Sequence, residues 1–157
     1  MLNEVYGNVL SGKYHWILHQ VNCKGVMGAG IAKQIRDRYP FVYQDYLKAL
    51  KYEHAGLGHI VVSREQGVNG LEIISMFAQE NFGYSGRYTD YDAFKKCLDL
   101  VADHVNQWSY KYHENFKVGI PYKIGCGLAG GDWEKVKKMI KEFSGKCKFD
   151  VDIVRLR

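Results

Sequence analysis

Residues 16–32 read WILHQVNCKGVMGAGIA, and this stretch determines how the rest of the chain is interpreted. Residues 16–21 form a nearly continuous apolar run, which is typical of a strand buried on both faces of a sheet. A turn with glycines at positions 25, 28 and 30 follows, and residues 31–39 then have the pattern of a helix. Glycine lets backbone amides approach a phosphate, and a helix N-terminus favours an anion. The stretch therefore predicts either an anion-binding loop or a tight turn without a ligand.

A second strand–loop–helix unit occupies residues 124–134, IGCGLAGGDWE. Ligands of open α/β sheets bind at the carboxyl ends of the strands, so we expect the two glycine-rich loops to lie together and to hold the two sides of one diphosphate. Neither loop is a Walker A motif or a regular G-x-G-x-x-G fingerprint. Asp132 is also well placed to be the N-cap of the helix that follows it.

Strands alternate with helices through most of the chain. We expect strands at residues 4–6, 16–21, 58–63, 71–78, 117–124 and 149–156, a turn at residues 67–70, and helices at residues 31–39, 41–50, 90–111 and 133–143. This order predicts an α/β protein, a three-layer α/β/α sandwich with a mixed, largely parallel central sheet. No repeat or linker divides the sequence, so residues 1–157 are expected to form a single domain.

Composition excludes several classes of protein. Apolar residues make up 46% of the chain and charged residues 25%, which argues against disorder. No apolar run approaches the roughly 20 residues that span a bilayer, so we expect no membrane partner. The chain starts without a secretory pattern, and its four cysteines form no C-x-x-C pair, so we expect a cytoplasmic protein with no metal and no cofactor. The formal charge of +5 suits an anionic ligand. The sequence contains no basic cluster with interleaved aromatic residues, so it gives no indication of nucleic-acid binding.

Three motifs together resemble the macro domain family. They are GNVL at residues 7–10, HQVNCKGVMGAGIAKQIRDRYP at residues 19–40 and IGCGLAGGDWEKV at residues 124–136. They occur in the family's order over nearly the whole chain, and they look most like the branch of yeast ADP-ribose 1″-phosphate phosphatase and terminal ADP-ribose protein glycohydrolase. The resemblance implies that the ligand is ADP-ribose, ADP-ribose 1″-phosphate or an ADP-ribosylated macromolecule.

The resemblance also implies roles for single residues. Asn8 matches the position that reads the adenine amino group, where many macro domains have aspartate, and its amide oxygen can accept the same hydrogen bond. Asn22 matches the asparagine beside the distal ribose. The residues that match the diphosphate and ribose loop are Gly28, Ala29, Gly30 and Ile31, and those that match the second phosphate loop are Gly125, Cys126, Gly127 and Leu128.

Two residues are candidates for catalysis. His19 matches a histidine implicated in catalysis by the yeast phosphatase, and Asp132 is the carboxylate nearest the second loop. The alternatives are a buried core histidine and a simple helix cap. His19 and Asn22 are three residues apart, so both can face a ligand only if the strand turns before Asn22. The lysine and aspartate used by the terminal glycohydrolase are replaced by Gln79 and Ala129, which cannot perform that chemistry.

The function predicted first is hydrolysis of ADP-ribose 1″-phosphate to ADP-ribose and phosphate. The alternatives are a non-catalytic reader of ADP-ribose and a hydrolase that removes ADP-ribose from modified protein or nucleic acid. Residues 79–92 are interpreted either as a lid over the distal ribose or as an ordinary surface loop.

Overall fold

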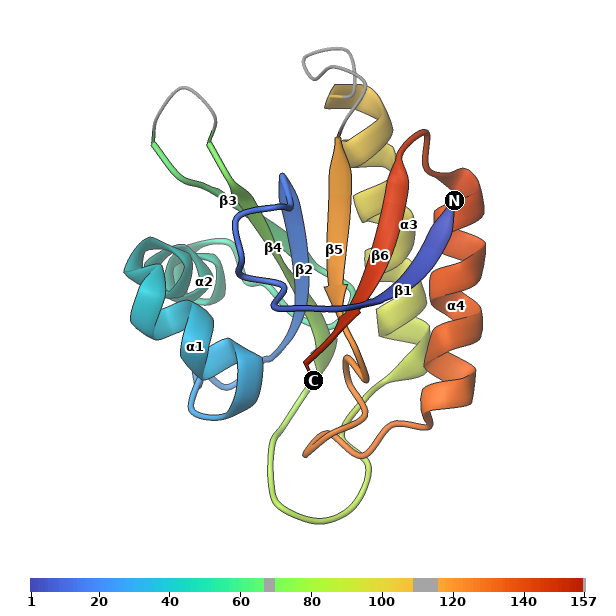
Figure 1. The fold of residues 1–157 in the computed structure, drawn as a ribbon. Helices are drawn as coiled ribbons and strands as arrows, with labels where there is room; N and C mark the ends of the chain where they lie inside the picture. Colours follow the sequence, from blue (N-terminus) through green and yellow to red (C-terminus); the bar gives the residue numbers. More distant parts are fainter. Residues whose placement is uncertain (67–69, 109–115, 157) are drawn as a thin grey trace.

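The computed structural model describes residues 1–66, 70–108 and 116–156, and it contains six strands and four helices in this part of the chain (Figure 1). The strands are β1 (Leu2–Tyr6), β2 (Trp16–Asn22), β3 (Ile60–Arg64), β4 (Glu72–Gln79), β5 (Lys117–Pro121) and β6 (Asp150–Arg155). The helices are α1 (Gly30–Arg38), α2 (Pro40–Tyr52), α3 (Tyr91–Trp108) and α4 (Trp133–Lys146). Every expected strand and helix is present. The turn expected at residues 67–70 and the expected end of the third helix fall mostly outside the described residues.

The sheet has the strand order β1-β6-β5-β2-β4-β3. All neighbouring strands are parallel except β3 and β4, which pair antiparallel, so the prediction of a mixed, largely parallel sheet is confirmed. Figure 1 shows α1 and α2 on one face of the sheet and α3 and α4 on the other. The three-layer α/β/α sandwich is therefore confirmed as well.

The central strands are apolar because both of their faces are covered. Every residue of β2 and β4 is buried. Along β2, Trp16 and Leu18 pack into the core under α3 and α4, whereas Ile17 and Val21 pack into the core under α1 and α2. This alternation is the period of two that a strand imposes on its side chains. The alternation decides which face of the sheet each side chain of β2 lies on.

Prolines mark two boundaries of the fold. Tyr39 ends α1 by donating its amide to Ile35, and Pro40 begins α2 at a position where no amide is needed. Strand β5 was expected to continue to residue 124, but it ends at Pro121. The chain turns there, and the Ile124 amide bonds back to the Pro121 carbonyl.

The parallel strands bring three connections to one end of the sheet. The connections are residues 23–29 after β2, residues 80–90 after β4 and residues 122–132 after β5, and they lie together at the lower end of Figure 1. This is the carboxyl edge, where α/β sheets bind ligands. No helix of the described chain is both long and apolar enough to cross a membrane.

Candidate functional site

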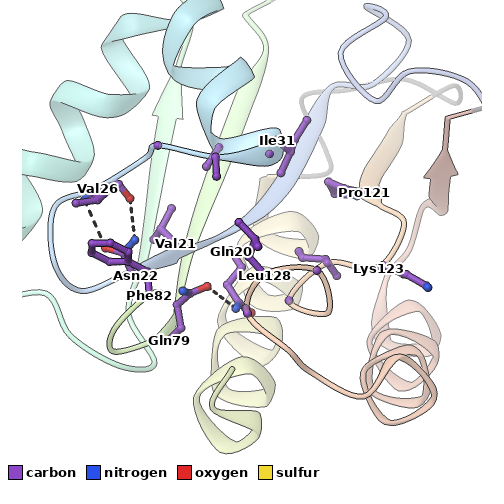
Figure 2. Close-up of a pocket in the computed structure, with 18 of the residues that line it drawn as sticks. Gln20, Val21, Asn22, Val26, Ile31, Gln79, Phe82, Pro121, Lys123 and Leu128 are labelled. Carbon is purple, nitrogen blue, oxygen red and sulfur yellow. Dashed lines mark hydrogen bonds between the residues drawn. The ribbon is translucent and has the colours of Figure 1, made fainter. Parts of the chain in front are cut away.

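A cavity of about 400 Å³ opens at the carboxyl ends of β2, β4 and β5, within the usual size range of small-molecule sites (Figure 2). It is lined by residues 20–22, 26, 28–32, 79, 82–84, 121–125 and 127–129. Both glycine-rich loops contribute to this lining, as the sequence predicts. Residues 82–84, from the segment interpreted as a lid, form part of the wall.

The first glycine-rich loop presents backbone amides to the cavity. Gly30 begins α1 with φ of 58°, a left-handed conformation that glycine adopts without strain. Ala29 is the N-cap and has no side chain that could satisfy the first amides of the helix. Among the described residues, no acceptor bonds to the amides of Gly28, Ala29, Gly30 or Ile31. Such a helix start attracts anions, because its free amides and its dipole both favour negative charge.

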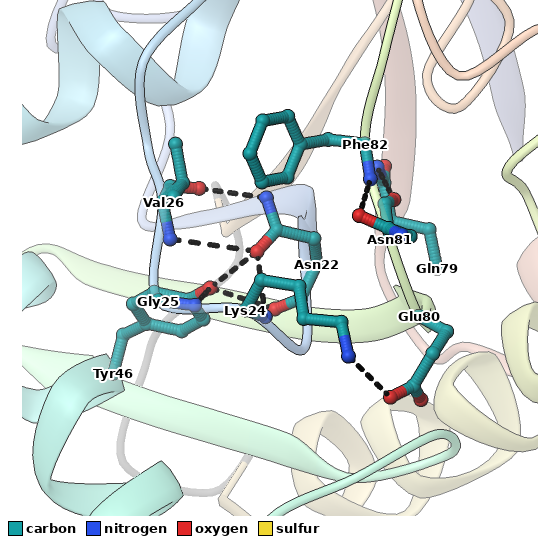
Figure 3. Close-up of polar contacts among 9 residues, drawn as sticks. All are labelled: Asn22, Lys24, Gly25, Val26, Tyr46, Gln79, Glu80, Asn81 and Phe82. Carbon is teal, nitrogen blue, oxygen red and sulfur yellow. Dashed lines mark hydrogen bonds and ion pairs between the residues drawn. The ribbon is translucent and has the colours of Figure 1, made fainter.

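Asn22 holds this loop in shape (Figure 3). Its Nδ2 donates to the Val26 carbonyl at 2.7 Å, and its Oδ1 accepts from the Lys24 amide at 2.9 Å. The hydroxyl of the fully buried Tyr46 lies 2.9 Å from the same Oδ1 and accepts from the Gly25 amide. Asn22 therefore lines the cavity and also organises the loop that follows, while its place beside the distal ribose stays a prediction.

The second loop is built from consecutive turns. The Cys126 amide bonds to the Lys123 carbonyl at 2.8 Å, and the Gly130 amide bonds to the Gly127 carbonyl at 3.0 Å. In the described chain, the amides of Gly127 and Leu128 have no protein acceptor. Both residues line the cavity, so these amides are donors available to a ligand there.

Of the eight described loop residues that the resemblance assigns to ligand binding, only Cys126 does not line the cavity. Burial raises the pKa of its thiol to about 11, so the thiol is neutral near pH 7. Burial likewise raises the pKa of the Cys23 thiol to about 11. Neither cysteine has the lowered pKa of a nucleophile.

His19 lies in the middle of β2 with none of its side chain exposed. Its Nε2 lies 2.8 Å from the Ser75 hydroxyl, and burial lowers the pKa of the imidazole to about 4. The chain does not turn before Asn22, because β2 continues through Asn22, but the register of β2 against β4 shifts between Val21 and Asn22 as it does at a β-bulge. Asn22 lines the cavity beyond this irregularity, whereas His19 is not among the lining residues. Its catalytic role stays a prediction, and its contacts are those of a core histidine.

Asp132 is the N-cap of α4. Its Oδ1 accepts from the Glu134 amide at 3.0 Å, and its own amide donates to the Tyr91 hydroxyl. It is exposed and does not line the cavity. The capping role is confirmed, and the catalytic role stays a prediction.

Asn8 lies in an exposed turn after β1, outside the cavity lining. Its Oδ1 accepts from the Leu10 amide at 2.9 Å, which leaves a second lone pair for another donor. Its proposed contact with adenine stays a prediction.

Sequence reasoning did not single out Gln20 or Lys123 as site residues. Gln20 lines the cavity from near the carboxyl end of β2. The one feature of the sequence that could have indicated Gln20 as a site residue is that it is polar within an apolar run. Lys123 has φ of 61° and, among the described residues that line the cavity, is the only one that carries a formal charge. No cluster of His, Cys, Asp and Glu in the described ranges could hold a metal ion.

The fold and the paired loops define this chain as a member of the macro domain family, whose model, Macro domain, matches residues 18–140. The chain is similar to ADP-ribose 1″-phosphate phosphatase of Saccharomyces cerevisiae, with 28% identity over 96% of this chain and 97% of the yeast protein. It is also 30% identical to DNA ADP-ribosyl glycohydrolase of Mycobacterium tuberculosis, where the match covers 89% of this chain but only 38% of the relative.

Solved structures share the fold. The macrodomain of Mycobacterium tuberculosis DarG superposes with a TM-score of 0.81 at 24% identity, covering 99% of this chain and 97% of that one. Thermosipho africanus DarTG in complex with ADP-ribose gives a TM-score of 0.78 at 18% identity, covering 96% of this chain and 40% of that one.

Proposed function

We propose that this chain binds ADP-ribose or ADP-ribose 1″-phosphate, with the diphosphate between residues 28–31 and residues 125–128. The observation that carries the proposal is that two glycine-rich loops, each with backbone amides that lack an acceptor among the described residues, line one cavity. Amides held by turns and by a helix start bind phosphate without needing a cationic side chain.

The charge of the cavity wall supports the same ligand. The described residues that line the cavity include no carboxylate, and Lys123 adds a positive charge. A ligand with two phosphate charges therefore meets amide dipoles and one cation, with no like charge in the wall to oppose it. The uncharged remainder of the wall, which includes Ile31, Phe82 and Leu128, suits the ribose and the base.

Phosphate removal from ADP-ribose 1″-phosphate is the activity we favour beyond binding. The supporting observation is that the matches to three yeast phosphatases cover 96%, 96% and 90% of this chain and 97%, 97% and 93% of the yeast proteins. A lysine-based mechanism is less suited to this cavity, because the family resemblance puts Gln79 at the lysine position and an amide is not a nucleophile. The wall instead offers amides that would stabilise charge on a departing phosphate.

Two measurements test these proposals. Titration calorimetry with ADP-ribose, AMP and ribose 5-phosphate should show tight binding only for the ligand that reaches both loops. Incubation with ADP-ribose 1″-phosphate should release phosphate, and incubation with ADP-ribosylated DNA and protein should leave the modification in place. Binding without release would leave a reader of ADP-ribose, whereas release of ADP-ribose from DNA or protein would replace the phosphatase with a glycohydrolase.

The compartment belongs to the same proposal. The four cysteines, Cys23, Cys97, Cys126 and Cys147, are all free. Free thiols persist in a reducing environment, and this supports a cytoplasmic protein.

A further inference from the structure

A buried glutamine joins three parts of the site. Gln20 is only 9% exposed, and its Nε2 donates to Gln79 Oε1 at 2.8 Å and to Thr89 Oγ1 at 2.9 Å. Figure 2 shows the bond between Gln20 and Gln79 beneath the cavity. Gln79 in turn donates to the Asn81 carbonyl at 2.8 Å. The central strand β2 is thereby tied to both ends of residues 80–90, the segment whose residues 82–84 form part of the cavity wall and which we call the lid.

The far end of the lid is attached to the second glycine-rich loop. The hydroxyl of Thr89, a residue only 1% exposed, donates to the Gly125 carbonyl at 2.5 Å. The amides of Tyr88 and Thr89 donate to the Ala129 carbonyl at 2.7 and 3.1 Å. Gly130 has φ of 70°, and a Cβ there would collide with the Gly86 carbonyl oxygen. The lid therefore packs against both ends of the second loop.

The number of hydrogens on each group decides which groups donate and which accept in this network. Both amide hydrogens of Gln20 are used, so Thr89 must accept from Gln20, and its single hydroxyl hydrogen is then committed to Gly125. A Cβ on Gly125 would lie 2.7 Å from Gln20 Oε1, so the carboxamide lies directly against the loop backbone. Each donor atom of the network has an acceptor, whereas the buried Gln20 Oε1 has no hydrogen-bond partner among the described residues. Hydrogen bonds in such a buried network order the groups that they join.

We propose that Gln20 and Thr89 are positioning residues that latch the lid to the second phosphate loop, so that the two segments order as one unit. The proposal rests on the proposed function, because it assigns to the latch the task of holding the amides of Gly127 and Leu128 in the arrangement that binds the ligand's phosphates. Neither latch side chain needs to touch the phosphate. Ligand affinity and lid order should consequently rise and fall together.

The first arm of the test removes one hydroxyl. Thr89→Val keeps the shape of the side chain but breaks the link to Gly125, whose carbonyl still accepts from the Gly131 amide, and Thr89→Ser restores the hydroxyl. We expect ADP-ribose to bind at least tenfold more weakly to Thr89→Val and within twofold of wild type to Thr89→Ser. Ser75→Ala is the matched control, since it removes a buried hydroxyl in the same sheet away from the cavity. It should lower the melting temperature without changing affinity.

The second arm needs no ligand. The amides of Tyr88, Thr89, Gly130 and Gly131 have acceptors within the lid and loop, so hydrogen exchange reports the latch directly. In Thr89→Val these amides should exchange at least tenfold faster, and in Ser75→Ala they should exchange at the wild-type rate. If Thr89→Val does not fold, Gln20→Met breaks the latch at its other end and should give the same pattern.

The two arms separate the latch from the function on which it rests. If wild type binds no ADP-ribose, the proposed function fails, and the exchange arm still decides whether the lid and loop are coupled. Unchanged exchange in Thr89→Val overturns the latch. A loss of affinity without faster exchange also overturns it, since the hydroxyl would then act on the ligand itself.

Discussion

Gly127 is the position at which an added negative charge tests the placement of the diphosphate most cleanly. It lines the cavity, a Cβ there meets nothing within 4 Å, and its φ is outside the left-handed region. A longer side chain therefore fits without backbone strain. Gly30 is a poorer choice, because its φ of 58° would add strain to any substitution. The informative pair is Gly127→Glu and Gly127→Gln, which have the same size and differ only in charge.

The expected difference follows from Coulomb's law. With the carboxylate about 6 Å from each phosphate charge and water between them, the repulsion is about 0.7 kcal/mol per charge, because the energy is roughly 332/(εr) with ε near 80. The two charges of the diphosphate give about 1.4 kcal/mol, which is about tenfold in affinity. The lower dielectric of a partly enclosed cavity makes this a minimum.

The assay is titration calorimetry with ADP-ribose at low ionic strength. Gly127→Glu should bind at least tenfold more weakly than Gly127→Gln. The ratio should shrink near physiological salt, where the Debye length falls to about 8 Å and approaches the separation of the charges. If wild type binds ADP-ribose and the two variants bind it equally at low salt, the diphosphate does not lie beside the second loop, and the placement is refuted.

The remaining predictions concern the base, the core and pH. Asn8→Ala should lower ADP-ribose affinity by about 1 kcal/mol, the usual worth of one neutral hydrogen bond, and leave ribose 5-phosphate binding unchanged; equal calorimetric titrations of both proteins would remove Asn8 from the site. The pKa of His19 is lowered from 6.5 to about 4 in the folded chain. Between these pH values the unfolded chain binds a proton that the folded chain does not. The free energy of unfolding therefore falls by up to about 3 kcal/mol as the pH falls through this window. Urea unfolding at pH 7 and pH 4.5 should show a smaller loss for His19→Gln than for wild type, and a loss of the same size would assign the pH dependence to other groups. Glu72 is fully buried and accepts from half-exposed Arg64 at 3.0 Å, so Glu72→Gln should lower the free energy of unfolding by about 2 kcal/mol at pH 7; an unchanged urea midpoint would show that this ion pair contributes nothing.

The residues at the boundaries of the site show which features the local sequence pattern predicts and which it does not. The sequence predicts that strand β5 continues to Ile124, yet it ends at Pro121 because the chain turns into the second loop. Asp132 has the local signature of a cap, and the structure shows that cap. His19 is next in sequence to the cavity-lining residues of β2, but its side chain is buried against Ser75. Local signals predicted the caps and loops better than they predicted which polar side chains reach the cavity.

The sequence by itself determined the number and order of the elements and the two glycine-rich loops. Those features depend on periodicity, glycine and proline, which act between residues close in the chain. The tertiary structure alone decided that Gln20, Thr89 and Gly125 meet. Their contact requires β2 to lie between β4 and β5, an arrangement fixed by strand pairing between distant segments. The directions of these three groups, and with them the shape of the candidate site, exist only once the sheet has formed.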